Sequence, residues 1–310
     1  MQLWRRRKQT QREPPLEAPE ALNPMPVIVG APRSGTTLLR FMLDAHPELA
    51  IPPETGFLRL GPELVERRVT ADEFFRTIVA FPETAPAWGD FGIDGESFRD
   101  ALNQSVPFTV AGGFRTFYRL YASRFQKSRW GDKTPLHCKA IEPIRQVLPE
   151  ARFLHIIRDG RDAALSLRRT WFSPGQEIET QAAYWRDCVT AARTAGVGRA
   201  DYFEVRYEAL IERPASLLKE ICSFIEIDFQ EAMCDYHLRT PQRLAEHRTR
   251  LRSDGTPLVT HDRRVDQSKL TTTPPDPSRV YVWKREMPAQ ERRRFSAVAG
   301  DLLEELGYER

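Results

Sequence analysis

Two hydrophobic patterns alternate along the chain. Short runs of consecutive apolar residues are typical of buried strands, and longer stretches with apolar residues every three or four positions are typical of helices. The predicted strands are residues 26–29, 153–157 and 202–207, with weaker candidates at 49–51 and 129–131. Because strands and helices alternate, the pattern favours an α/β fold, with helices flanking a central, mostly parallel sheet in three layers.

The helical stretches each have one apolar face. The first follows the 26–29 strand and ends at His46-Pro47; its apolar residues are Leu38, Leu39, Met42 and Leu43. A second face is aromatic, and we interpret it as core packing rather than a stacking platform: Phe114, Phe117, Tyr118, Tyr121 and Phe125. Further helices are predicted over 215–225 and 289–306, the last with Gly307 as its C-terminal cap.

Two stretches lack either pattern and are predicted as long loops. Residues 81–95 are rich in Pro and Gly, and residues 240–276 are crowded with Arg, Asp, Thr and Pro. Loops of this length in a compact domain are usually lids, binding loops or disordered segments. With no internal repeat and no strong linker, we expect one domain over 24–310, after a flexible basic, Pro-rich tail over 1–23.

Composition narrows the class of protein. The chain has 310 residues, 41% hydrophobic and 29% charged, as in ordinary soluble globular proteins. A net charge of +3 does not indicate a nucleic-acid binder. No apolar run approaches the roughly 18 residues needed to span a bilayer, and the basic N-terminus has no apolar stretch typical of a signal peptide. The four widely spaced cysteines predict reduced thiols and a cytoplasmic location.

The stretch "GAPRSGTT" at 30–37 carries the first chemical signal, because it joins a strand to a helix. Such a loop points backbone N–H groups at a helix N-terminus and forms an anion site. Gly30 allows the turn and Gly35 a close backbone approach, and Arg33 supplies a planar cation for phosphate oxygens. Hydroxyl donors come from Ser34, Thr36 and Thr37.

The glycine spacing is that of the P-loop G-x-x-x-x-G-K-[ST], but Thr36 stands where the motif has Lys. Nucleotide-hydrolysing P-loop proteins also need an acid for Mg²⁺, and Arg158 occupies the position directly after the second apolar strand. The histidines lack metal-ligand spacing. The sequence therefore predicts a phosphate group held without a metal; a ligand-free helix-capping turn is the simpler alternative.

The stretch "RDGRDAALS" predicts a second anion site. Arg158 stands at a strand end and Ser166 on the following helix, so both can converge on one anion. Two anion sites on adjacent strand–helix turns indicate a nucleotide with phosphates at both ends of its ribose.

In these motifs the chain resembles the PAPS-dependent sulfotransferases, whose donor carries a sulfated 5′-phosphate and a separate 3′-phosphate. "PRSGTT" is similar to the family's 5′-phosphosulfate loop and "RDGRDAALS" to its 3′-phosphate motif. The resemblance runs from about Pro26 onward and includes "WGDKTP", "VRYEALIERP" and "SRVYVWK". It implies a P-loop NTPase-like fold and sulfuryl transfer from PAPS, without a metal, to a hydroxyl or phenolic group.

The first motif, extended to "PRSGTTLLRFMLDAHPELAIPPET", is most similar to tyrosylprotein sulfotransferases. Those enzymes use the Glu before the final Thr as catalytic base, which implies this role for Glu54. The chain departs from them in lacking a membrane anchor and in having one acid in "IPPET" where they carry two. The acceptor therefore stays open between a small molecule and a peptide. His46 and His137 are rival bases.

The resemblance also assigns the remaining residues. Arg33 contacts the 5′-phosphate and the bridging oxygen, Lys133 places a cation near the transferring sulfuryl group, and Tyr207 faces the adenine. Ser278, Arg279 and Lys284 close over the phosphates, with Trp283 packed beneath. The acceptor pocket is expected between residues 57 and 129 and after residue 240.

Two other functions remain open at this point. A P-loop kinase or other phosphotransferase is disfavoured by the missing Lys and the missing acid. A non-catalytic nucleotide-binding protein on the same fold is disfavoured by Glu54 and Lys133.

Overall fold

The computed structural model describes residues 22–309. The predicted tail over 1–23 lies outside the described residues, apart from Leu22 and Asn23, so its division from the domain stays a prediction.

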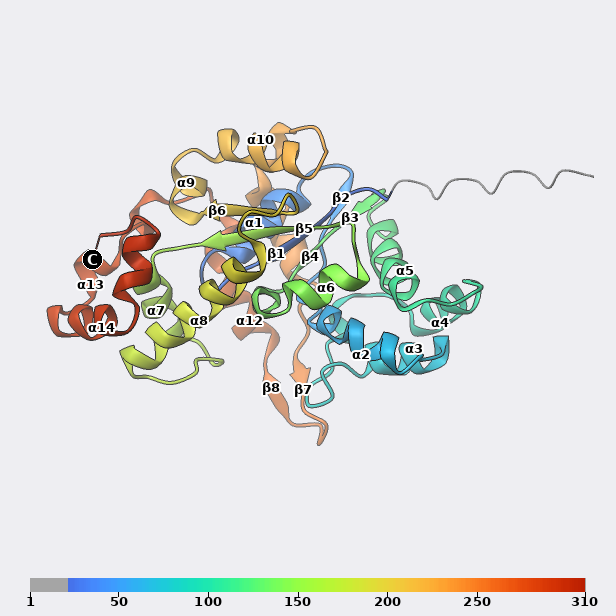
Figure 1. Cartoon of the computed structure of the whole chain (residues 1–310). Helices are drawn as coiled ribbons and strands as arrows, with labels where there is room; N and C mark the ends of the chain where they lie inside the picture. Colours follow the sequence, from blue (N-terminus) through green and yellow to red (C-terminus); the bar gives the residue numbers. More distant parts are fainter. Residues whose placement is uncertain (1–21, 310) are drawn as a thin grey trace, which may run out of the picture.

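A sheet of four parallel strands, in the order β4-β1-β5-β6, forms the centre of the fold (Figure 1). A short parallel pair, β2–β3, and an antiparallel hairpin, β7–β8, are separate from it. The strands are β1 Met25–Val29, β2 Leu49–Ala50, β3 Arg129–Trp130, β4 Asp132–Lys133, β5 Ala151–Ile157, β6 Tyr202–Arg206, β7 Arg250–Leu251 and β8 Pro257–Val259. All five predicted strands are confirmed. The pattern missed β4 and the hairpin because two or three residues are too short to show a period.

Helices cover both faces of this sheet, as Figure 1 shows for α9 and α10 above the strands and α6 and α8 below. The α-helices are α1 Thr36–Asp44, α2 Gly61–Glu66, α3 Ala71–Val79, α4 Gly95–Asn103, α5 Val110–Ser123, α6 Ile141–Val147, α7 Gly160–Arg168, α8 Ile178–Gly196, α9 Tyr207–Glu212, α10 Pro214–Phe224, α11 Thr240–Leu244, α12 His261–Ser268, α13 Trp283–Glu286 and α14 Ala289–Glu305. Along β1, Val27 and Val29 belong to the hydrophobic cluster that includes residues of α5, α6 and α8, whereas Ile28 belongs to the cluster that includes residues of α1 and α10. Both faces of the strand are buried, which explains its uninterrupted apolar run. The three-layer α/β prediction is confirmed.

Two local predictions about helices are also confirmed. The aromatic face of α5 is core, because Phe114, Phe117, Tyr118 and Tyr121 are all buried. The last helix ends in a Schellman motif, in which Gly307 (φ 75°) donates to the Glu304 carbonyl and Tyr308 to the Leu303 carbonyl.

The prediction of a long loop over 240–276 is wrong. The segment folds into α11, the β7–β8 hairpin, which projects from the body in Figure 1, and α12. Its structure depends on ion pairs: the buried Asp90 carboxylate accepts hydrogen bonds from Arg264 (2.7 Å) and Arg250 (3.1 Å). Since α12 has no buried residue, hydrophobic periodicity could not reveal it. Asp90 itself lies in the 81–95 stretch, which is irregular apart from the 3₁₀ turn Trp88–Asp90.

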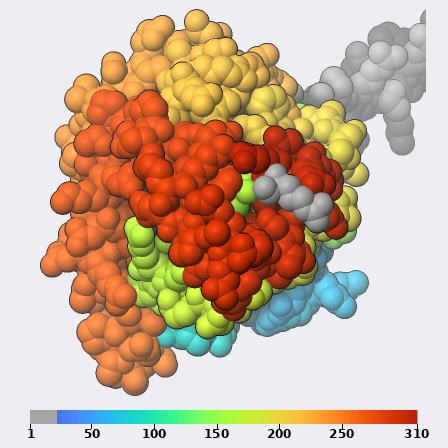
Figure 2. Space-filling model, turned by 90° about the vertical axis from the view of Figure 1, so that its left-hand side faces the viewer, coloured from blue at the N-terminus to red at the C-terminus, as the bar shows by residue number. Residues whose placement is uncertain are grey.

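The C-terminal residues, red in Figure 2, spread over one side of the molecule beside the orange segment that precedes them. Within residues 22–309, no helix is both long and apolar enough to cross a membrane.

Candidate active site

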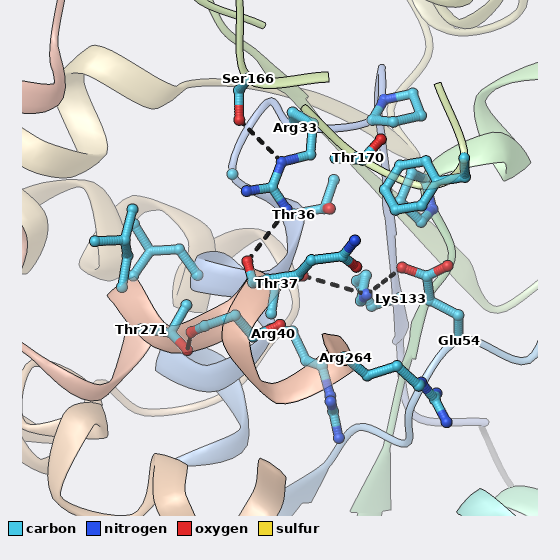
Figure 3. A pocket seen from close by; sticks show the side chains of 18 of the residues that line it. Arg33, Thr36, Thr37, Arg40, Glu54, Lys133, Ser166, Thr170, Arg264 and Thr271 are labelled. Atoms are coloured by element: carbon cyan, nitrogen blue, oxygen red, sulfur yellow. Dashed lines mark hydrogen bonds and ion pairs between the residues drawn. The ribbon is translucent and has the colours of Figure 1, made fainter. Parts of the chain in front are cut away.

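The carboxyl ends of β1, β4, β5 and β6 meet at one edge of the sheet, where ligands bind in open α/β folds. A cavity of about 980 Å³ lies there (Figure 3). Of the residues that the sequence predicted for the site, those that line it are Arg33, Gly35, Thr36, Thr37, Glu54, Lys133, Arg158, Ser166, Tyr207 and Arg279.

The loop between β1 and α1 requires glycine at position 35. Gly35 has φ 101°, and a Cβ atom there would lie 2.5 Å from the ring of Tyr207. The loop backbone therefore lies against the residue that begins α9. The hydroxyl of Ser34, in the same loop, is buried and has no hydrogen-bond partner among the described residues.

We expect Gly35→Ala to lower the free energy of unfolding by about 1–3 kcal/mol through left-handed backbone strain, with an added penalty for the Tyr207 contact. Gly198→Ala is the matched control, because Gly198 also has positive φ (82°) but no atom within 4 Å of the added methyl. Urea denaturation measures both. Equal losses in the two variants would show that the Tyr207 contact is not what selects glycine.

Glu54 and Lys133 form an ion pair in the cavity, with 2.6 Å between Oε1 and Nζ (Figure 3). Lys133 comes from the end of β4 and is buried, whereas 51% of the Glu54 side chain is exposed, toward the cavity that it lines. Lys133 also lies 3.5 Å from the Thr37 hydroxyl at the start of α1. Burial alone would raise the pKa of Glu54, but the Lys133 ammonium holds it below its usual value.

A second cluster holds the two arginines of the predicted anion sites. Arg33 Nε donates to the Ser166 hydroxyl at 3.0 Å, so the first loop and α7 already meet. Arg158 donates to the Arg33 carbonyl (3.3 Å) and pairs with Asp162 (3.3 Å). Burial, followed by the nearby charge of Arg158, lowers the pKa of Arg33. Two guanidinium groups this close leave a region that favours an anion.

Near Arg158 lie the residue predicted to face the adenine and two residues of the segment predicted to close over the phosphates. Tyr207 is buried at the cavity wall, and the Arg158 guanidinium lies 4.4 Å above its ring centre. Arg279 lines the cavity, and its carbonyl accepts from Arg158 at 2.8 Å. Trp283 is buried, with the Arg161 guanidinium 3.5 Å from its ring centre.

Three predicted residues are not among those that line the cavity. Ser34 is fully buried, the Ser278 hydroxyl donates to the Asp276 carboxylate at 2.8 Å, and Lys284 pairs with Glu309 at 2.7 Å. A cofactor contact from these side chains stays a prediction.

The two rival bases differ in position. His46 is buried away from the cavity lining, with Nε2 2.9 Å from the Asp228 carbonyl. His137 does line the cavity, and its Nε2 lies 3.6 Å from Asp132. Burial lowers the pKa of His137, so this imidazole is neutral near pH 7 and remains a rival to Glu54.

Several cavity residues were missed by the sequence analysis. Arg40 on α1 and Arg264 on α12 lie below the Glu54–Lys133 pair in Figure 3, and Thr271 lies on the opposite side of the cavity from that pair. The backbone carbonyl of Gln267, at the end of α12, accepts from Arg33 at 3.3 Å. A binding loop was expected after residue 240, but single positions could not be chosen there because many arginines have the same local pattern. Within residues 22–309, no group of three or more His, Cys, Asp or Glu is placed to hold a metal ion.

Comparison with known proteins agrees with this geometry. The nodulation protein NoeE of Sinorhizobium fredii is 26% identical over 93% of this chain and 67% of its own length. Protein-tyrosine sulfotransferases of Caenorhabditis elegans (27%, 67% of this chain) and Drosophila melanogaster (25%, 92% of this chain) are also similar. The alignments span about half the length of these two relatives, 51% and 52%.

Among solved structures, the sulfotransferase domain of the Synechococcus PCC 7002 olefin synthase has the same fold. Its TM-score is 0.57 at 22% identity, covering 94% of this chain and 98% of that one. The model of the sulfotransferase family matches residues 24–231, more than half of the sequence. The chain therefore belongs to the sulfotransferase family.

Proposed function

We propose that the protein transfers a sulfuryl group from PAPS to a hydroxyl or phenolic acceptor, with Glu54 as general base. One observation carries the proposal: the Arg33–Ser166–Arg158 cluster and the Glu54–Lys133 pair line the same cavity. An anion cradle beside a carboxylate and a buried ammonium is the set of groups that in-line sulfuryl transfer requires.

The residues present fit PAPS. Arg158 lines the cavity, and its Nε is a buried donor without a partner among the described residues, so the predicted 3′-phosphate site has unused hydrogen-bonding capacity. PAPS supplies an activated sulfuryl group on its 5′-phosphate. The backbone amides after Arg33 would hold that phosphate, Arg158 and Ser166 would bind the 3′-phosphate, and the Tyr207 ring would lie against the adenine.

Lys133 and Glu54 have the two remaining roles in the reaction, charge stabilisation and proton transfer. The Lys133 ammonium stabilises negative charge as it grows on the leaving phosphate, and in doing so it releases the Glu54 carboxylate. The carboxylate then accepts the proton of the acceptor hydroxyl. The similarity to protein-tyrosine sulfotransferases supports a hydroxyl-bearing acceptor, small molecule or peptide. A cytoplasmic location is also proposed, supported by four cysteines that are all free thiols.

Calorimetric titration with PAP, the desulfated product, tests the cofactor. We expect micromolar or tighter binding without added metal, weakened at least about tenfold (~1.4 kcal/mol) in Arg158→Ala. Arg199→Ala is the control, because Arg199 is an exposed arginine outside the cavity. Binding of ATP with Mg²⁺ but not of PAP would sink the proposal and favour a phosphotransferase.

A further inference from the structure

Behind the Glu54–Lys133 pair lies a carboxylate that forms no ion pair with a lysine or arginine among the described residues. Asp132 precedes Lys133 in β4 and is fully buried. Its Oδ2 accepts from the hydroxyls of Thr55 (2.6 Å) and Tyr118 (2.9 Å), while its Oδ1 has no hydrogen bond among the described residues. The nearest cationic candidate is His137 at 3.6 Å, and burial lowers its pKa. A fully buried carboxyl group with one oxygen left without a hydrogen bond is costly, which argues against a purely structural role for Asp132.

The hydroxyl bonded most closely to Asp132 belongs to the residue after Glu54. Both residues line the cavity, but Thr55 is buried and its hydroxyl donates to Asp132, whereas half of the Glu54 side chain is exposed and its carboxylate pairs with Lys133. Among the described residues, none forms a backbone hydrogen bond with residues 52–55. The segment is held at its ends, by Ile51 N donating to Asp44 (2.8 Å) and Gly56 N to Thr134 (3.3 Å). Between them, the Thr55–Asp132 hydrogen bond is the anchor nearest to Glu54.

We propose that Asp132 is a positioning residue for Glu54, acting through the Thr55 hydroxyl. The inference rests on the proposed role of Glu54 and adds to it the residue that holds the base. Asp132 does not itself meet the acceptor, because it is fully buried and does not line the cavity. Asp132 fixes the backbone from which the Glu54 side chain reaches Lys133. Asp132 and Lys133 are consecutive residues of β4, so their side chains point to opposite sides of the strand.

Thr55 and Tyr118 each donate a hydroxyl hydrogen bond to Asp132 Oδ2, so substitutions at these two positions form a matched pair of variants. Thr55→Val and Tyr118→Phe each remove one hydroxyl from Asp132 Oδ2 and keep the shape of the side chain. Only Thr55 is covalently next to Glu54. A packing role for Asp132 predicts similar effects of the two variants, whereas positioning predicts an effect of Thr55→Val alone.

The variants are compared by sulfuryl transfer from PAPS to N-acetyltyrosinamide. We expect Thr55→Val to lower kcat at least about tenfold, as small misplacements of a reacting group do, with KM for PAPS and PAP affinity unchanged. Thr55→Ser should restore kcat, and Tyr118→Phe should leave it near the wild-type value. A kcat loss in Tyr118→Phe equal to that in Thr55→Val would overturn the proposal, as would an unchanged kcat in Thr55→Val.

A second readout does not depend on the acceptor. NMR titration of ¹³C-labelled glutamate, with Glu54 assigned from Glu54→Gln, follows the pKa that Lys133 lowers. Thr55→Val should raise the Glu54 midpoint, because a displaced carboxylate loses the ammonium; Tyr118→Phe should not. If Thr55→Val does not fold, Thr55→Ala makes the same test. Full activity of Glu54→Gln would instead reject the base assignment, independently of these titrations.

Discussion

Replacing Glu54 by glutamine is expected to lower kcat by about 10²–10⁴-fold, the range that a general base contributes. Glutamine keeps the shape of the side chain but cannot accept the acceptor proton. PAP affinity should not fall, because Glu54 lies in the Lys133 half of the site and contacts neither Arg33 nor Arg158. Initial rates with PAPS and N-acetyltyrosinamide, together with PAP calorimetry, separate the two effects.

The control for this variant is Glu63→Gln, which removes an exposed carboxylate on α2 that pairs only with Arg67. Its kcat should equal that of the wild type. The opposite pattern, an active Glu54→Gln and an inactive His137→Gln, would assign the base to His137, the other titratable candidate in the cavity lining.

Replacing Lys133 by methionine is expected to lower kcat by about 10²–10³-fold, as when one preorganised donor to a transition-state charge is removed. The variant should also change the pH profile. In the wild type the pKa of Glu54 is lowered. The base therefore stays ionised, and kcat/KM stays high, at pH values below the range in which glutamate usually titrates. Without the ammonium, the largest of the charges that lower the pKa of Glu54 is lost, although Arg250 and Arg264 still lower it. The pKa of Glu54 therefore rises from its wild-type value, and the acidic limb of kcat/KM moves to higher pH.

Lys219→Met controls for loss of a positive charge elsewhere, since Lys219 is exposed on α10 and lies outside the cavity lining. A Lys133→Met enzyme with reduced kcat but an unmoved acidic limb would show that Lys133 acts only on the leaving group. An unchanged kcat would remove Lys133 from the mechanism.

Local sequence was enough to predict the two turns that carry Arg33 and Arg158 at the cavity. The loop after β1 and the turn after β5 each lie within one strand–turn–helix unit, so the backbone conformation of a few neighbouring residues decides their shape. Gly35, Arg33 and Arg158 could therefore be named from spacing, and the parallel sheet then brings the two turns together at its carboxyl edge. Glu54 and Lys133 were named through resemblance, not from spacing.

Tertiary structure alone decided how the other residues of the site are arranged. Glu54 and Lys133 are 79 positions apart, and only the pairing of β4 with β1, beside β2–β3, places them 2.6 Å from each other. The 240–276 segment forms helices and a hairpin because the buried Asp90 binds its arginines, which no hydrophobic period records. Ser278 and Lys284 follow the family's sequence, yet their side chains pair with Asp276 and Glu309. The sequence by itself determined the longer strands, the helices with an apolar face and the two strand–helix turns, whereas long-range ion pairs and strand order decided which side chains share the cavity.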